Sequence, residues 1–163
     1  GIRVTHLDSH QHVHILPGLA DLSLQLAARY NIPFVRVPVV DLRGDRRPSL
    51  HGVNRMLGAT ARRASWVLAR LTGARAVKHR PLRFVGFQAG GRLDELRLRR
   101  LLRALRPGPA YELMCHPGLT PDEPDVKRWQ YGHEKELQAL TSSAIRSEIA
   151  GRGIQLCNFK DLT

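Results

Sequence analysis

Residues 5–14 read Thr-His-Leu-Asp-Ser-His-Gln-His-Val-His and place four histidines and one aspartate within nine positions. They begin on a predicted buried strand over residues 4–8 and lead toward a turn at Pro17-Gly18. On an extended backbone, alternate positions share one side; the polar residues at these positions are His6, Asp8, His10, His12 and His14. Imidazoles and a carboxylate suit Zn²⁺ or a similar divalent ion, and parallel α/β proteins bind ligands at the carboxyl ends of strands. The stretch therefore predicts a ligand site at a strand end.

A second histidine stands at the end of another predicted strand. Residues 112–118 read Glu-Leu-Met-Cys-His-Pro-Gly, and the strand ends just before His116. Pro117 favours an extended backbone at His116. His116 should therefore face the same edge of the sheet as His10, where an imidazole suits a general acid that protonates a leaving group. A histidine that only caps or packs is the alternative.

Two further side chains lie beside these positions. Arg36 ends the predicted strand over residues 33–37 and could hold a carboxylate with a forked hydrogen bond or contact a substrate. An ordinary arginine at a strand end is an equal alternative. Cys115 precedes His116, so on a strand the two side chains point to opposite faces. This spacing argues against a cysteine nucleophile paired with His116.

Predicted strands and helices alternate along the whole chain, which favours a parallel α/β architecture. The strands are predicted over residues 4–8, 33–37, 84–87, 111–115 and 154–159. The helices are predicted over residues 18–30, 51–72, 94–105, 133–140 and 141–151. In the helix over 18–30, helical spacing is shown by Leu19, Leu22, Leu26 and Tyr30.

The length and composition fit one compact domain. The chain has 163 residues, 42% of them hydrophobic and 25% charged. No apolar run approaches about 18 residues, which argues against a membrane-spanning helix. Two cysteines form no C-x-x-C motif and are too few for a disulfide scaffold. We therefore expect a reducing, cytoplasmic setting.

Basic residues gather in the middle of the chain. The net charge is +12, yet the segment from Arg43 to Arg106 alone holds 17 basic and three acidic residues, a net charge of +14. Such a block can attract phosphates of nucleic acid or of an anionic membrane surface. It can equally be a solvated helix face in an arginine-rich protein. Trp66 stands nearly alone among these arginines as a stacking aromatic, and no helix-turn-helix, zinc-finger or RNP pattern is present.

The two histidine motifs resemble those of the YdjC-like carbohydrate deacetylase family, whose members are metal-dependent enzymes on a (β/α) barrel. The resemblance covers essentially the whole chain, and residues 5–14 carry its most specific motif. It is closest to the hopanoid-biosynthesis-associated branch, on residues 84–92 and 129–137. It implies one barrel domain over residues 1–163, with an Arg-rich helical insertion at about 43–80.

The resemblance also implies a reaction and a site. The reaction removes an acetyl group from an N-acetylated amino sugar, with Mg²⁺ or Zn²⁺ activating water. His10 matches a metal ligand, and His116 matches the histidine that acts on the leaving amine. The remaining positions are expected to line the site or contact the substrate: Asp8, His12, His14 and Arg36.

The sequence departs from the family pattern near its start. Family members carry an Asp-Asp pair and a further ligand histidine, and this chain has no Asp-Asp pair and only His6 before His10. We therefore expect an incomplete (β/α) barrel with parallel strands that lacks the first strands. On this expectation the chain is the C-terminal part of an N-terminally truncated deacetylase. It should bind metal weakly and have little activity.

Two other functions remain open on the sequence. One is a metal-dependent phosphoesterase or amidohydrolase, which also places histidines at strand ends. The other is a non-catalytic basic module that binds nucleic acid or an anionic membrane. The deacetylase hypothesis involves no nucleic acid and leaves a homodimer open. It permits peripheral membrane association through the basic helix over residues 51–72, beside a lipid-linked sugar.

Overall fold

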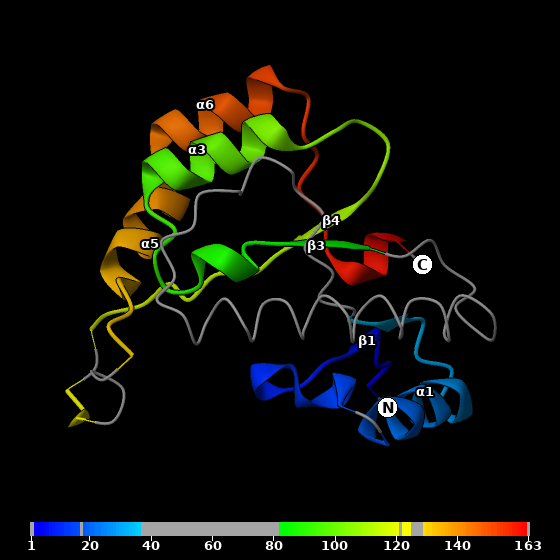
Figure 1. Cartoon of the computed structure of the whole chain (residues 1–163). Coiled ribbons are helices and arrows are strands. Elements are labelled where there is room, and N and C mark those ends of the chain that lie inside the picture. The colour runs from blue at the N-terminus through cyan, green and yellow to red at the C-terminus, as the bar shows by residue number, and fades with distance from the viewer. Residues whose placement is uncertain (1, 17, 37–81, 121, 125–128, 163) are drawn as a thin grey trace. The chain divides into compact units, whose positions relative to one another are not determined.

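The computed structural model describes residues 2–16, 18–36, 82–120, 122–124 and 129–162 (Figure 1). These residues fall into two compact units. The first contains residues 2–36, 82–84 and 157–162, and the second contains the described residues between 85 and 156. The predicted helix over 51–72 and the Arg-rich insertion at 43–80 lie outside the described residues.

The first unit is built around a short β–α–β segment. Strand β1 (His6–Leu7) pairs in parallel with β2 (Phe34–Val35), with His6 opposite Phe34 and Leu7 opposite Val35. Helix α1 (Leu19–Arg29) connects the two strands. The described residues are therefore mixed α/β with short parallel strands, as the alternating pattern predicts.

Helix α1 confirms the predicted helix but not its expected buried face. The leucine stripe is largely at the surface, since Leu19 is 43% and Leu22 is 49% exposed. The buried residues are Ala20, Ser23 and Ala27, which are spaced three and four positions apart. Small side chains allow a helix to lie close to its neighbours, and helical spacing alone does not reveal which stripe meets them.

The backbone after β1 is not extended as the alternation argument assumed. Residues His10–Ile15 form the 3-10 turns η1, in which Gln11 and His12 have φ values of 52° and 57°. This left-handed conformation is uncommon for residues other than glycine. It rotates the side chains of this segment out of strict alternation, so sharing a face by parity applies only up to Asp8.

The second unit packs three helices beside a two-stranded sheet (Figure 1). Strand β3 (Arg83–Val85) ends in this unit and pairs with β4 (Tyr111–Leu113). The helices are α3 (Glu95–Ala104), α5 (His133–Thr141) and α6 (Ser143–Gly151). Their shared core consists of Leu93, Leu98, Leu102, Ala139 and Ile145.

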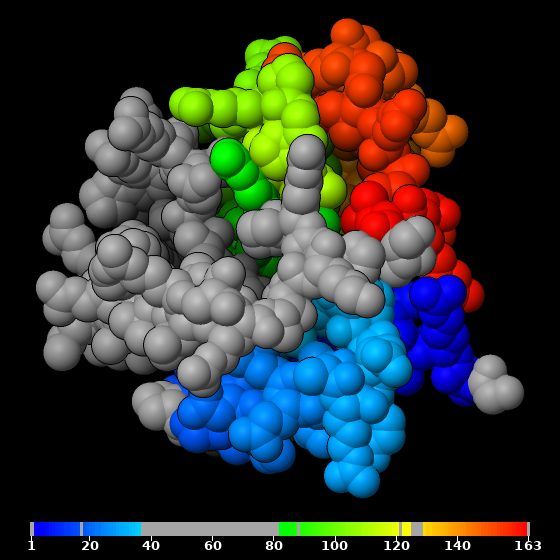
Figure 2. All heavy atoms as spheres, turned by 90° about the vertical axis from the view of Figure 1, so that its right-hand side faces the viewer, coloured from blue at the N-terminus to red at the C-terminus, as the bar shows by residue number. Residues whose placement is uncertain are grey.

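Local sequence explains where these helices begin. The Asp94 carboxylate accepts a hydrogen bond from the Arg97 backbone N–H (2.8 Å) at the start of α3. The Ser142 hydroxyl accepts one from the Ala144 N–H (3.2 Å) at the start of α6. Both are preferred N-cap residues. Figure 2 shows α6, in orange-red, with its outer side at the surface.

The predicted strand over residues 154–159 is wrong. Residues 154–158 belong to no strand or helix, and Phe159–Leu162 form the 3-10 turn η3. Leu156 is 80% exposed, so the apolar run buries little surface in the part of the chain that the structure describes. A strand needs a neighbouring strand, and the described residues supply none here. Within those same residues, no helix is both long and apolar enough to cross a membrane.

Candidate functional site

An ion pair joins the ends of the two parallel strands in the first unit. The Arg36 guanidinium contacts the Asp8 carboxylate, and the Arg36 backbone N–H donates to the Leu7 carbonyl (3.0 Å). The Arg36 guanidinium carbon also lies 5.4 Å from the centroid of the Phe84 ring. The side chain of Arg36 is therefore held against an aromatic face and a carboxylate at once.

His14 is buried beneath this pair and bonds through both ring nitrogens. The carbonyl oxygen of Arg36 can only accept, so His14 Nε2–H donates to it (2.7 Å). His14 Nδ1 then accepts from the Ser9 hydroxyl (2.7 Å), whose oxygen in turn accepts from the His14 backbone N–H (2.9 Å). This network engages both ring nitrogens of His14 and supports the end of β2.

The other two histidines of η1 differ in exposure. His12 is buried, and its ring meets the edge of Phe84 at a centroid distance of 5.2 Å and His14 at 6.2 Å. His10, the first residue of η1, is exposed. Within the described residues, no three His, Cys, Asp or Glu side chains are arranged to hold a metal ion. The donors present therefore do not complete a divalent-cation site by themselves.

His116 lies in the second unit, three residues after the end of β4. Its backbone N–H donates to Glu136 Oε2 (2.5 Å), and its carbonyl accepts from His133 Nδ1–H (2.7 Å). Glu136 is fully buried, and its Oε1 accepts from the Leu93 N–H (2.9 Å). One buried carboxylate thus connects the turn after β4 to the segment before α3.

Aromatic rings surround the half-buried His116 side chain. The Tyr131 ring centroid lies 4.8 Å from that of His116 and 5.7 Å from that of His133. Gly91 makes room for Tyr131, because a Cβ at Gly91 would lie 2.2 Å from the tyrosine ring. Gly91 also has φ +70°, which favours glycine. Its carbonyl accepts from the Gly132 N–H (2.6 Å).

Burial and two neighbouring side chains shift the pKa of His116. Burial lowers the pKa of His116, Glu136 raises that pKa, and His133 lowers it, so that the pKa falls below its usual value. Burial raises the pKa of the neighbouring Cys115 thiol, and the charge of Glu136 raises it further. A thiol with a raised pKa is a poor nucleophile near neutral pH, which agrees with the sequence argument against Cys115.

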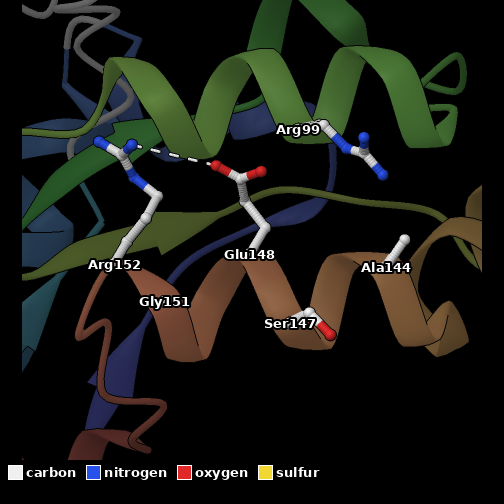
Figure 3. Close-up of a pocket in the computed structure, with 6 residues that line it drawn as sticks. All are labelled: Arg99, Ala144, Ser147, Glu148, Gly151 and Arg152. Carbon is white, nitrogen blue, oxygen red and sulfur yellow. Dashed lines mark ion pairs between the residues drawn. The ribbon is translucent and has the colours of Figure 1, made fainter.

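A shallow pocket also lies between α3 and α6, lined by Arg99, Ala144, Ser147, Glu148, Gly151 and Arg152 (Figure 3). Glu148 accepts two hydrogen bonds from Arg103, each 3.0 Å long, and lies 3.9 Å from Arg152. The bond from Arg103 is the main reason that the pKa of Glu148 is lowered. The hydrogen bonds between Glu148 in α6 and Arg103 in α3 join the two helices. The charged residues at this pocket therefore have a structural role.

The predicted site residues therefore form two groups. Asp8, His10, His12, His14 and Arg36 belong to the first unit, and His116 belongs to the second. The sequence prediction of the site missed Tyr131, His133 and Glu136. One signal for Glu136 was available, because a charged residue three positions before a buried alanine of the same helix lies on that helix's buried face.

The described residues form a mixed α/β protein with histidines just after the ends of β1 and β4. The sequence profile of the YdjC-like protein family matches residues 1–151, so the chain belongs to that family. No solved structure matches the chain.

Curated relatives share its sequence over nearly its full length. A carbohydrate deacetylase of Mus musculus is 33% identical over 97% of this chain and 55% of its own length. A carbohydrate deacetylase of Geobacillus stearothermophilus is 29% identical over 99% of this chain and 53% of its own length. A chitooligosaccharide deacetylase of Serratia marcescens is 30% identical over 97% of this chain and 53% of its own length. The chain thus spans about half the length of these relatives.

Proposed function

We propose that this chain belongs to a carbohydrate deacetylase, a hydrolase that removes the acetyl group from an N-acetylated amino sugar. Membership of the YdjC-like family and the names of the curated relatives support this proposal. The observation that carries it is the position of His116, which is held at a strand end beside Glu136, His133 and Tyr131.

The chemistry needs a proton donor at the departing nitrogen. Water adds to the amide carbonyl, the C–N bond breaks, and the products are acetate and a protonated amine. An amine nitrogen leaves readily only after it receives a proton, which the His116 imidazolium supplies. Burial lowers the pKa of His116, so that its imidazolium gives up a proton readily near pH 7. The neutral ring can then take up a proton again within the same turnover.

The residues of the first unit belong to a separate part of the proposal, the binding of a metal ion. A divalent cation, Mg²⁺ or Zn²⁺, is part of this proposal, with the exposed His10 as one of its ligands. Asp8, His12, His14 and Arg36 line or support the site. The Asp8–Arg36 pair and the His14 bonds attach the segment from Asp8 to His14, which contains His10, to the end of β2.

The finer part of the proposal concerns the substrate and its location. The sugar is attached to a lipid of the hopanoid type, and the protein is cytoplasmic with peripheral membrane contact through the Arg-rich segment. The support is the net charge of +14 between Arg43 and Arg106 and the resemblance over residues 84–92 and 129–137. Flotation with anionic vesicles should carry the protein upward at low salt, and vesicles that float without it would exclude this contact.

The activity is tested on the whole natural protein with N-acetylglucosamine oligomers by measuring acetate release. The variant His116→Gln should lower kcat by about 10²–10⁴-fold, the usual contribution of a general acid. The variant Cys115→Ala is the matched control at the neighbouring position and should retain most activity. Phosphate release from a generic phosphoester, with no acetate release, would instead favour a phosphoesterase.

A further inference from the structure

The turn that carries His116 is held on both sides of one residue by the start of α5. Glu136 accepts the N–H of His116 and His133 donates to its C=O. The next residue, Pro117, has no N–H, and the following N–H, from Gly118, donates to the His133 carbonyl (3.3 Å). Glu136 and His133 are three positions apart in α5 and therefore lie on the same face of the helix.

The ring of His116 has a different relation to the carboxylate than in a usual histidine–carboxylate pair. In such a pair the carboxylate accepts directly from a ring nitrogen. Here Glu136 uses both oxygens on backbone N–H groups, and His116 Nδ1 is buried without a hydrogen-bond partner among the described residues. The carboxylate therefore acts on the half-buried ring through space, without a direct hydrogen bond to a ring nitrogen.

We propose that Glu136 and His133 are positioning residues for His116, which hold its backbone from both sides and determine how readily its imidazole carries a proton. The inference rests on the proposed function, in which His116 is the proton donor. Both residues also fix the backbone of His116, so the same two side chains determine where the imidazole lies and how readily it carries a proton.

The side chains near His116 shift its pKa in opposite directions. From α5, Glu136 raises the pKa of His116 and His133 lowers it, after burial has lowered it most. Tyr131 contributes a phenol ring from the segment before α5, and Cys115 contributes a neighbouring thiol whose pKa is raised. With its raised pKa, the Cys115 thiol adds no net charge near pH 7. The balance therefore depends on the two residues of the helix.

Two variants of the whole natural protein separate electrostatic positioning from simple support. Glu136→Gln removes the negative charge while keeping the size of the side chain. His133→Asn removes the imidazole while its amide N–H replaces Nδ1–H toward the His116 carbonyl. The His116 ring proton is then titrated by NMR. We expect a lower pKa of His116 in Glu136→Gln and a higher one in His133→Asn.

The control is Glu134→Gln, which removes an exposed carboxylate from the same turn of α5 and should leave the titration of His116 unchanged. A role in support alone predicts shifts of the same sign, or none, in the two test variants, and either result overturns the proposal. If Glu136→Gln does not fold, His133→Asn decides, because an unchanged or lowered pKa contradicts the inference.

Kinetics provide the second measurement. Activity that depends on a protonated His116 falls as pH rises through its pKa, so this alkaline limb should move to lower pH in Glu136→Gln and to higher pH in His133→Asn. We expect kcat on the alkaline side to fall severalfold in Glu136→Gln and to rise in His133→Asn. Shifts seen by NMR in a protein without deacetylase activity would refute the proposed function and leave the electrostatic pairing intact.

Discussion

Tyr131 can lie beside His116 because residue 91 is a glycine, which has a hydrogen atom in place of a Cβ. A Cβ there would meet the ring at 2.2 Å, and φ is +70°. We expect Gly91→Ala to lower the free energy of unfolding by about 1–3 kcal/mol, the usual cost of overpacking, with a further cost from the left-handed backbone. Denaturation by urea measures this. Gly151→Ala is the control, since nothing lies within 4 Å of the added Cβ, and an equal loss there would contradict the explanation.

The residue scale also shows how far the sequence alone could predict the site. The cluster of histidines correctly marks residues 6–14 as polar groups at a strand end, because their spacing can be read directly from the sequence. The alternation of His10, His12 and His14 could not be carried further, since the φ values at Gln11 and His12 depend on the surrounding packing. Glu136 was missed because its bonds reach 20 and 43 residues away.

At the scale of helices and strands, α3 and α6 are joined by the pairing of Arg103 with Glu148. The pKa of Glu148 is lowered in the folded protein, mainly by the hydrogen bond from Arg103. Its contribution to stability is therefore present above the usual glutamate pKa and is lost as pH falls through the lowered one. We expect Glu148→Gln to reduce the free energy of unfolding at neutral pH and to weaken its fall in acid.

Urea unfolding of the whole protein between about pH 3 and pH 7 measures this dependence. Glu123→Gln, which changes an exposed carboxylate, is the matched control and should follow the parent protein across the range. An acid dependence that Glu148→Gln leaves unchanged would show that the helix pair does not depend on this charge.

Helix positions were easier to predict than the faces they bury. Asp94 and the spacing of Leu98 and Leu102 predict α3 and its buried side, because one strongly apolar stripe faces arginines. In α1 the same rule selects the leucine stripe, although Ala20 and Ala27 are the residues buried. Periodicity reports that a helix has two faces, whereas the neighbours that select one of them are distant in sequence.

At the scale of the whole molecule, the described residues hold no group of three His, Cys, Asp or Glu side chains that could bind a metal ion. A stable Zn²⁺ site generally needs at least three protein ligands. We therefore expect isothermal titration of this chain with Zn²⁺ or Mg²⁺ to show weak binding, which His10→Ala abolishes and His6→Ala preserves. Tight binding of one ion per chain would contradict this expectation.

One carboxylate carries hydrogen bonds from two segments that lie far apart in the sequence, at Leu93 and His116. Because Glu136 is sealed from water, neither amide proton can reach solvent until the side chain withdraws, and its withdrawal releases both. The two amides should therefore exchange with deuterium at a common rate, as a single cooperative opening. An opening of the segment before α3 would in this way also release the turn that follows β4, because both segments are bonded to Glu136.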